Sequence, residues 1–239
     1  MHQDLTAEPT TEGTTAFAPF FIYIGAVVQY TSRNMTYDRD SLNAFQSILS
    51  MWKRFLFPEG FSWGLPIFSH PQSLSWFHVR AATPRRRPGF PTWSWSGWAG
   101  EIMYPGSMSS ATEIDDLKQH DLLPEILDVV GEELNIKAWT VVLDIRTEPF
   151  SEAYIPGTDT YVGIVSERNF LHNNTLPSCT YECLVLARVK EASDKEVLYL
   201  LLLERNGRLL SRKTFITLRM PRKLEFATLG PILQVNTLV

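Results

Sequence analysis

The residues best suited to chemistry are three consecutive arginines, Arg85 to Arg87, which precede a run of tryptophans. A guanidinium group can stack on an indole ring or bind a phosphate group. Basic side chains interleaved with aromatic rings are also typical of surfaces that bind single-stranded nucleic acid. Three arginines before Pro88 are, however, more often a solvated loop. The sequence therefore disfavours nucleic acid as a partner and keeps a nucleic-acid-binding module at residues 85–98 as an alternative only.

Catalytic motifs are missing from the sequence. It contains no Gly-x-Ser-x-Gly elbow, no Gly-x-x-x-x-Gly-Lys phosphate loop, no His-Glu-x-x-His and no Gly-x-Gly-x-x-Gly after a strand. Acidic pairs such as Asp115-Asp116 and Glu132-Glu133 lie in polar surroundings that are typical of a solvated face. We therefore predict no catalytic residue, no cofactor and no metal site. The alternative is a small-molecule enzyme whose site is assembled from acidic residues and the scattered histidines His70, His78, His120 and His172.

The tryptophans themselves favour a structural interpretation. Trp93 and Trp95 are two residues apart, so an extended segment would place both rings on one face, with Trp98 close by after a bend at Gly97. Each large ring can bury about 200 Å². We predict a tryptophan-lined core that clamps a helix of residues 40–53 onto a β-rich part, braced by Arg87. An exposed aromatic recognition patch is the alternative.

The elements around this block predict an α+β fold. The run from Phe20 to Tyr30 is short, aromatic and β-branched, which favours a buried strand. Apolar residues then recur at helical spacing up to Phe55, with Asp38 or Asp40 as the cap, and we expect Arg33 to pair with Asp40 at the entry. Pro58 and Gly60 end this amphipathic helix. The three later expectations are a tryptophan-rich connecting region at 61–106, a mixed helix at 113–130 that Pro124 interrupts, and a β-rich region at 132–220.

The β-rich region shows the two-residue alternation of strands. Trp139 to Ile145 and Tyr181 to Val189 alternate, and Leu198 to Leu203 is apolar on both faces, which is typical of a strand covered on both sides. Asn206-Gly207 predicts a type I′ hairpin turn. We expect a mostly antiparallel sheet of about five or six strands.

Composition limits the class of protein. The chain has 239 residues, is 44% hydrophobic and has a formal net charge of -4, so it can bury a large core and has no global basic field. No apolar stretch approaches the roughly 20 residues that cross a membrane. Cys179 and Cys183 would lie about 13 Å apart along a strand, which predicts buried thiols without a disulfide in a reducing, cytoplasmic setting. Residues 1–18 are expected to be disordered and 19–239 to form a single unit.

Three segments together resemble one family. Residues 85–102 read Arg-Arg-Arg-Pro-Gly-Phe-Pro-Thr-Trp-Ser-Trp-Ser-Gly-Trp-Ala-Gly-Glu-Ile. They resemble the Arg-Pro-x-Phe-Pro-Ser-Trp-Ser-Trp-Ala-Gly-Trp block that follows the signature domain of fungal heterokaryon-incompatibility (HET) proteins. Residues 30–45 and 61–76 look like two further blocks of that family in the same order. The resembling region spans 28–110, and the family-motif residues are Arg33, Asp40, Arg87, Pro91, Trp93, Trp95 and Trp98.

The resemblance implies a function in non-self recognition and programmed cell death. The family's signature domain, which is distantly similar to the TIR fold, is not in this chain, so the resemblance assigns any NAD cleavage to residues outside it. It implies a non-catalytic supporting or recognition region, with a protein as the possible partner.

Overall fold

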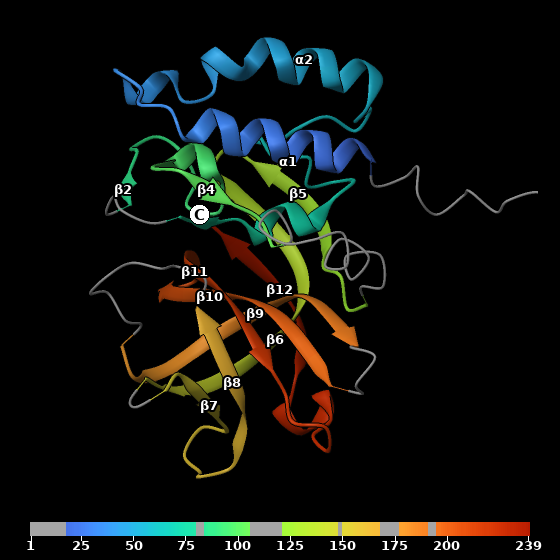
Figure 1. Ribbon diagram of the computed structural model, residues 1–239, viewed down its shortest axis with the longest axis vertical. Helices are drawn as coiled ribbons and strands as arrows, with labels where there is room; N and C mark the ends of the chain where they lie inside the picture. The colour runs from blue at the N-terminus through green and yellow to red at the C-terminus, as the bar shows by residue number, and fades with distance from the viewer. Residues whose placement is uncertain (1–17, 80–83, 106–120, 148–149, 168–176, 191–194) are drawn as a thin grey trace, which may run out of the picture.

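The computed structural model describes residues 18–79, 84–105, 121–147, 150–167, 177–190 and 195–239. A layer of helices and short strands lies at one end of the molecule and a large sheet at the other (Figure 1). The predicted α+β class is confirmed. The predicted disordered segment, apart from Ala18, lies outside the described residues. The helical layer contains α1 (Ala18–Thr31), η1 (Asp38–Asp40), η2 (Asn43–Phe45), α2 (Gln46–Phe55), η3 (Pro71–Ser75), β1 (Phe77–His78), β2 (Arg85–Arg86), η4 (Trp95–Gly97), β3 (Trp98–Ala99) and β4 (Ile102–Met103).

The predicted strand at residues 20–30 is wrong, because these residues form α1. Its inward residues recur at helical steps: Phe20, Tyr23, Ile24 and Val27 are buried. The outward side carries Ile22 with small residues rather than charges, so the run is apolar almost all round and its period is weak. Burial against the aromatic core therefore overrides the β propensity of its branched residues.

The amphipathic helix is confirmed but starts later than expected. Two 3₁₀ turns, η1 and η2, precede α2, and the N-cap residue of α2 is Phe45, so the prediction that Asp38 or Asp40 caps this helix is wrong. Leu49 and Trp52 face the core from α2, and Lys53 and Arg54 lie in its last turn.

Within the described residues, the large sheet has eight strands rather than the expected five or six. Six of them form a closed ring in the order β6, β9, β10, β11, β8, β7 and back to β6, with antiparallel pairing throughout. The remaining two pair with the first half of the long strand β6, and β12 also forms one parallel bridge to β11. The strands are β5 (Glu125–Val130), β6 (Glu133–Arg146), β7 (Glu152–Tyr154), β8 (Tyr161–Glu167), β9 (Cys179–Lys190), β10 (Glu196–Asn206), β11 (Leu209–Arg219) and β12 (Ile232–Leu238), with η5 (Phe226–Leu229) before the last.

Two local predictions in the β half need correction. The expected helix at 113–130 is wrong where it is described, because residues 125–130 are β5, held by its ladder to β6; residues 113–120 lie outside the described residues. The β10–β11 hairpin is confirmed, but Asn206 pairs with Leu209, so the turn residues are Gly207 and Arg208. Gly207 has φ +64° while Arg208 keeps a negative φ, which fits a type II′ turn rather than I′.

Strand β10 contributes to two hydrophobic cores. Leu201 and Leu203 pack toward the helical layer, and Leu198, Leu200 and Leu202 pack inside the ring. The prediction of a strand covered on both faces is confirmed. Strands β6, β9 and β11 also contribute side chains to both cores. The core of the helical layer and the core of the ring are therefore built on the same strands.

Two smaller expectations are also settled. Cys179 and Cys183 are both free, but Cys179 is exposed at the start of β9, so the prediction of two buried thiols is right only for Cys183. Among the described residues, none of the helices has the length and apolar character needed to cross a membrane.

Candidate functional site

The tryptophan block, which we define as residues 85–102, contributes its rings to the core of the helical layer. Trp93 and Trp95 are fully buried, as is the neighbouring Trp76, and Trp98 is half-buried. Trp95 packs edge-on against Phe45, their ring centroids 5.9 Å apart. The predicted core interpretation is confirmed, because rings this deeply buried cannot form an exposed patch.

Every indole N–H of the block has an acceptor. Trp93 Nε1 donates to the carbonyl oxygen of Glu132 at 2.9 Å, which ties the block to the turn before β6. Trp95 Nε1 donates to the hydroxyl of Tyr23 on α1 at 3.0 Å. Trp98 Nε1 donates to the Thr92 carbonyl at 2.9 Å and closes the loop on itself. The block therefore joins α1, its own loop and the large sheet.

The chain reverses tightly between Pro91, which is buried, and Gly97. A β-carbon at Gly97 would lie 2.2 Å from the carbonyl oxygen of Pro91 and 2.5 Å from Nη1 of Arg86. Only glycine leaves room for this approach.

Arg87 is the polar centre of the block and is only 4% exposed. Its Nη1 donates to the Ser41 hydroxyl at 2.9 Å and to the carbonyl oxygen of Trp98. Its Nε lies 3.5 Å from an oxygen of Asp38, near enough for attraction although the geometry makes no hydrogen bond. Burial lowers the pKa of Arg87, and the Asp38 carboxylate opposes that shift. The predicted bracing role matches this set of contacts.

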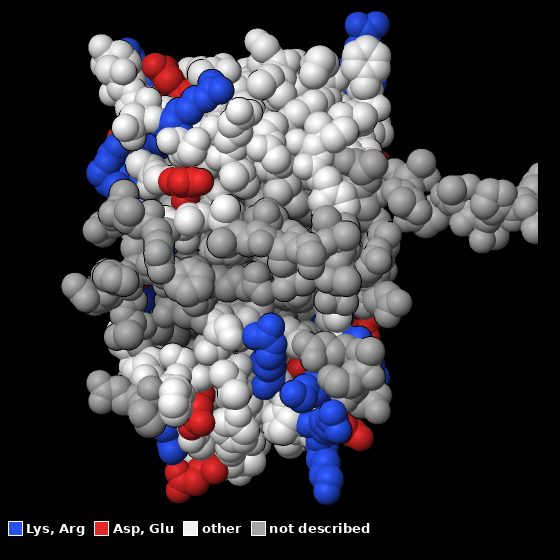
Figure 2. All heavy atoms as spheres, viewed as in Figure 1, with Lys and Arg blue, Asp and Glu red and all other residues white. Residues whose placement is uncertain are grey.

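The other two arginines are also engaged. Arg85 is exposed and makes a bidentate pair with Asp38, at 2.6 and 2.8 Å. Arg86 donates to the carbonyls of Phe90 and Gly97 and stacks 5.0 Å from the Trp98 ring centroid. In Figure 2, basic and acidic atoms lie together on the left of the helical layer, where Figure 1 labels β2. Because the guanidinium groups are already occupied, the block does not offer the free basic row that a phosphate backbone needs.

The expected pair between Arg33 and Asp40 is wrong. Neither side chain makes an ion pair or hydrogen bond with any described residue, and the arginines of the block instead engage Asp38. The sequence offered Asp38 only as a helix cap, because the 47-residue separation from Arg85 gives no local signal.

A second buried arginine fixes this layer to the sheet. Arg212 of β11 is 4% exposed and donates to the carbonyl oxygens of Leu74 and Trp76. Its guanidinium lies 3.5 Å from the Trp76 ring centroid. Burial lowers the pKa of Arg212 to about 9. No ion pair with a carboxylate is found for Arg212 among the described residues, so carbonyl oxygens and the indole face stabilise its charge.

His78 is the buried titratable group nearest to this arginine. Neither ring nitrogen has a hydrogen-bond partner within the described part of the chain, and the ring lies between Trp76 and Trp98. Burial, together with the nearby cations Arg212 and Arg87, lowers the pKa of His78 to about 4. His70 instead stacks on Phe20, so these two histidines pack separately. His120 and His172 lie outside the described residues.

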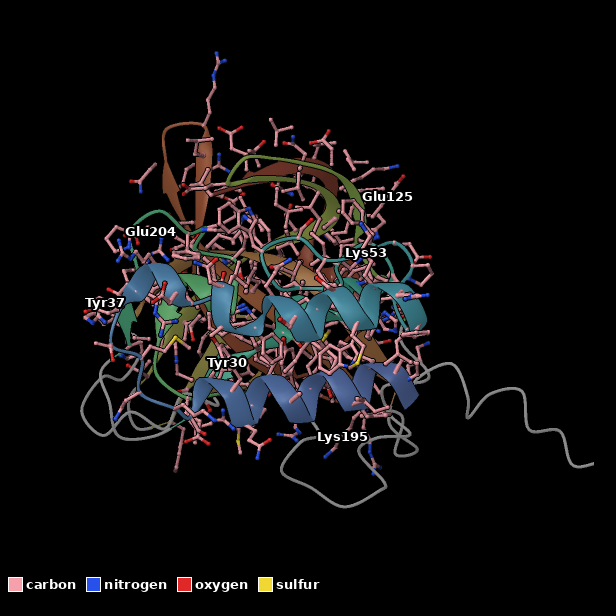
Figure 3. All side chains as sticks on the ribbon, turned by 90° about the horizontal axis from the view of Figure 1, so that it is seen from above. Tyr30, Tyr37, Lys53, Glu125, Lys195 and Glu204 are labelled. Atoms are coloured by element: carbon pink, nitrogen blue, oxygen red, sulfur yellow. The ribbon has the colours of Figure 1, made fainter. Side chains whose placement is uncertain are left out.

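A groove opens beside the block at the end of α1. Its volume is about 340 Å³, and we call it the Tyr30–Ala44 groove. In Figure 3, Tyr37 lies at the left edge of the molecule, and Tyr30 lies near the left end of α1. Arg33 and Asp40, whose side chains have no partner among the described residues, both line this groove. The full lining is Tyr30, Arg33, Asn34, Met35, Thr36, Tyr37, Asp40 and Ala44. The described residues hold no group of three His, Cys, Asp or Glu side chains suited to a metal ion.

Comparison of the chain with protein-family models, with curated proteins and with solved structures finds no match.

Proposed function

We propose that this chain is a non-catalytic supporting and recognition region of a protein of the fungal heterokaryon-incompatibility type, acting in the cytoplasm in non-self recognition linked to cell death. The observation that supports the proposal is the convergence of the three resembling segments. Ser41 donates to the carbonyl oxygen of Ser96 at 2.8 Å and accepts from Arg87, and the Ser94 hydroxyl donates to the carbonyl oxygen of Trp63 at 2.6 Å. Residues 30–45, 61–76 and 85–102 thus meet in one centre.

This arrangement favours support over chemistry. The polar groups of the block form hydrogen bonds with backbone carbonyls and with one another, and the rings of Trp93 and Trp95 are buried. Such a centre stabilises a scaffold, while Arg33 and Asp40, whose side chains have no partner among the described residues, lie at the adjacent groove where a partner can meet them. A protein partner is therefore part of the proposal.

The test of the proposal is genetic. The coding sequence is deleted from the source strain, which is then paired with a panel of genetically distinct strains, and cell death in fused cells is scored. We expect at least one incompatible pairing to become compatible and the restored gene to bring rejection back. Unchanged rejection in every pairing contradicts the proposal.

A biochemical assay separates this proposal from the enzyme alternative. The purified chain is incubated with NAD, and the products are resolved by chromatography. We expect no turnover. Turnover that disappears when one acidic residue is replaced would establish an enzyme instead.

A further inference from the structure

The Tyr30–Ala44 groove contains two opposite charges that the fold does not use. Arg33 and Asp40 both line it, and neither side chain makes a hydrogen bond, ion pair or ring contact with any described residue. Burial raises the pKa of Tyr30, and both charges of the groove act on the same hydroxyl, because Asp40 raises this pKa further and Arg33 lowers it. No salt bridge joins these two described side chains to each other. The fold therefore presents a cationic and an anionic contact side by side.

The floor of the groove is firmly held. Tyr30 donates to the Ser41 carbonyl at 3.0 Å, and Met35 receives contacts at its sulfur from Arg87 Nη2 at 3.6 Å and from the Tyr30 hydroxyl at 3.9 Å. Arg87 is itself fixed by the tryptophan block. The groove thus lies beside the hydrogen-bonded centre around Arg87, and a ligand would meet preformed contacts at its floor.

The rim of the groove is open. Tyr37 is 58% exposed, with the Arg39 guanidinium 5.5 Å from its ring centroid. Sites for small molecules bury most of the ligand, whereas exposed tyrosine and arginine are enriched where proteins meet. An open groove with free charges suits a chain segment that continues beyond both ends of it.

We propose that the Tyr30–Ala44 groove binds a peptide segment of a protein partner that presents an acidic side chain to Arg33 and a basic side chain to Asp40. The inference rests on the proposed recognition function and assigns the site that performs it. Asn34 and Thr36, whose side chains have no hydrogen-bond partner among the described residues, face the same segment and can bond its backbone.

The first test uses defined peptides. The probe is acetyl-Gly-Glu-Gly-Lys-Gly-amide, in which an extended backbone projects both charges to one face. Its controls replace the glutamate or the lysine of the peptide by glutamine. Titration into the ¹⁵N-labelled chain should give saturable shifts at residues 30–44, with both controls binding about tenfold more weakly, as expected for loss of one charge-assisted contact. Shifts that do not saturate, or that centre elsewhere, overturn the proposal.

The second test uses variants of the chain. Arg33→Asp and Asp40→Arg should each weaken binding of the probe by about tenfold, because each leaves two like charges in the groove. The double variant restores one charge of each sign and should bind within about threefold of the parent chain. Arg54→Gln, at the far end of α2, is the matched control and should bind normally. Single variants that bind like the parent contradict the proposal.

The outcome can be separated from that of the proposed function. If deletion of the gene abolishes rejection but the Arg33→Asp allele still supports it and the peptide does not bind, the recognition function stands and the groove is wrong. If the peptide binds as predicted while every pairing remains incompatible after deletion, the groove stands and the incompatibility function is wrong.

Discussion

Replacing Arg87 by lysine tests the bracing role of this residue most closely. The substitution keeps the positive charge but removes the planar fork of donors. In the parent chain Nη1 bonds the Ser41 hydroxyl and the Trp98 carbonyl, while Nη2 reaches the sulfur of Met35 and Nε approaches Asp38. A lysine ammonium can occupy only one of these positions and leaves about two buried contacts unmade.

The expected loss of unfolding free energy is about 2 kcal/mol, because each net hydrogen bond contributes about 1 kcal/mol. Arg87→Met should cost more, about 3 kcal/mol, since it leaves the Ser41 hydroxyl and the Trp98 carbonyl without the Arg87 donor. The assay is urea unfolding followed by tryptophan fluorescence, with the slope checked for constancy so that the midpoint reports stability.

Arg85→Lys is the matched control, because Arg85 is exposed and its pair with Asp38 is open to solvent. It should leave the midpoint unchanged. If Arg87→Lys unfolds at the same urea concentration as the parent chain, the bracing interpretation is refuted. Steeply salt-dependent binding of single-stranded oligonucleotides by the parent chain would then favour the nucleic-acid alternative.

Three further results are expected. Trp95→Ala should destabilise the chain by about 3 to 5 kcal/mol in the same urea assay, because it empties a fully buried site; an unchanged midpoint would mean that the ring is not core. Gly97→Ala should cost at least about 2 kcal/mol, because its β-carbon would lie 2.2 Å from the Pro91 carbonyl oxygen, whereas Gly207→Ala, with nothing within 4 Å, isolates the cost of positive φ alone. His78 has a folded-state pKa of about 4, below its ordinary value of 6.5, so the neutral ring is favoured by folding. The contribution of His78 to the free energy of unfolding is complete above pH 6.5. It falls by about 3 kcal/mol as the pH drops from 6.5 through 4, because the histidine takes up its proton in the unfolded chain before it does so in the folded chain. His78→Phe should flatten this part of the stability profile measured from pH 7 to 4, and an unaltered profile would exclude His78 as its cause.

Much of the β half could be predicted because its signal is local. Trp139 to Ile145 alternates, and Val141, Leu143 and Ile145 are buried in that order, while a glycine marks the β10–β11 turn. The observed turn lies one residue later than the predicted one, because the sequence does not show whether Asn206 stays in the ladder. Helix α1 was missed because its solvent side carries Ile22 and Gly25 instead of charges, which hides the helical period.

The site was only partly predictable for a different reason. The burial of Trp93 and Trp95 follows from their size, and a role for Arg87 follows from its position beside them. Its partner Asp38 lies 49 positions earlier in the sequence, and no local pattern distinguishes it from Asp40. Long-range pairs of this kind depend on the tertiary fold, so sequence spacing alone cannot assign them.

The most direct test of the central claim, that the tryptophan block is the structural centre and not a binding surface, is hydrogen exchange at the indole N–H groups measured by NMR. The donors of Trp76, Trp93 and Trp95 are buried and bonded to Trp93 O, Glu132 O and Tyr23 Oη. We predict that these three exchange only through global unfolding, with the same opening free energy as the slowest amides of β10. Exchange of the Trp93 or Trp95 indole at rates near those of a free indole would contradict the claim.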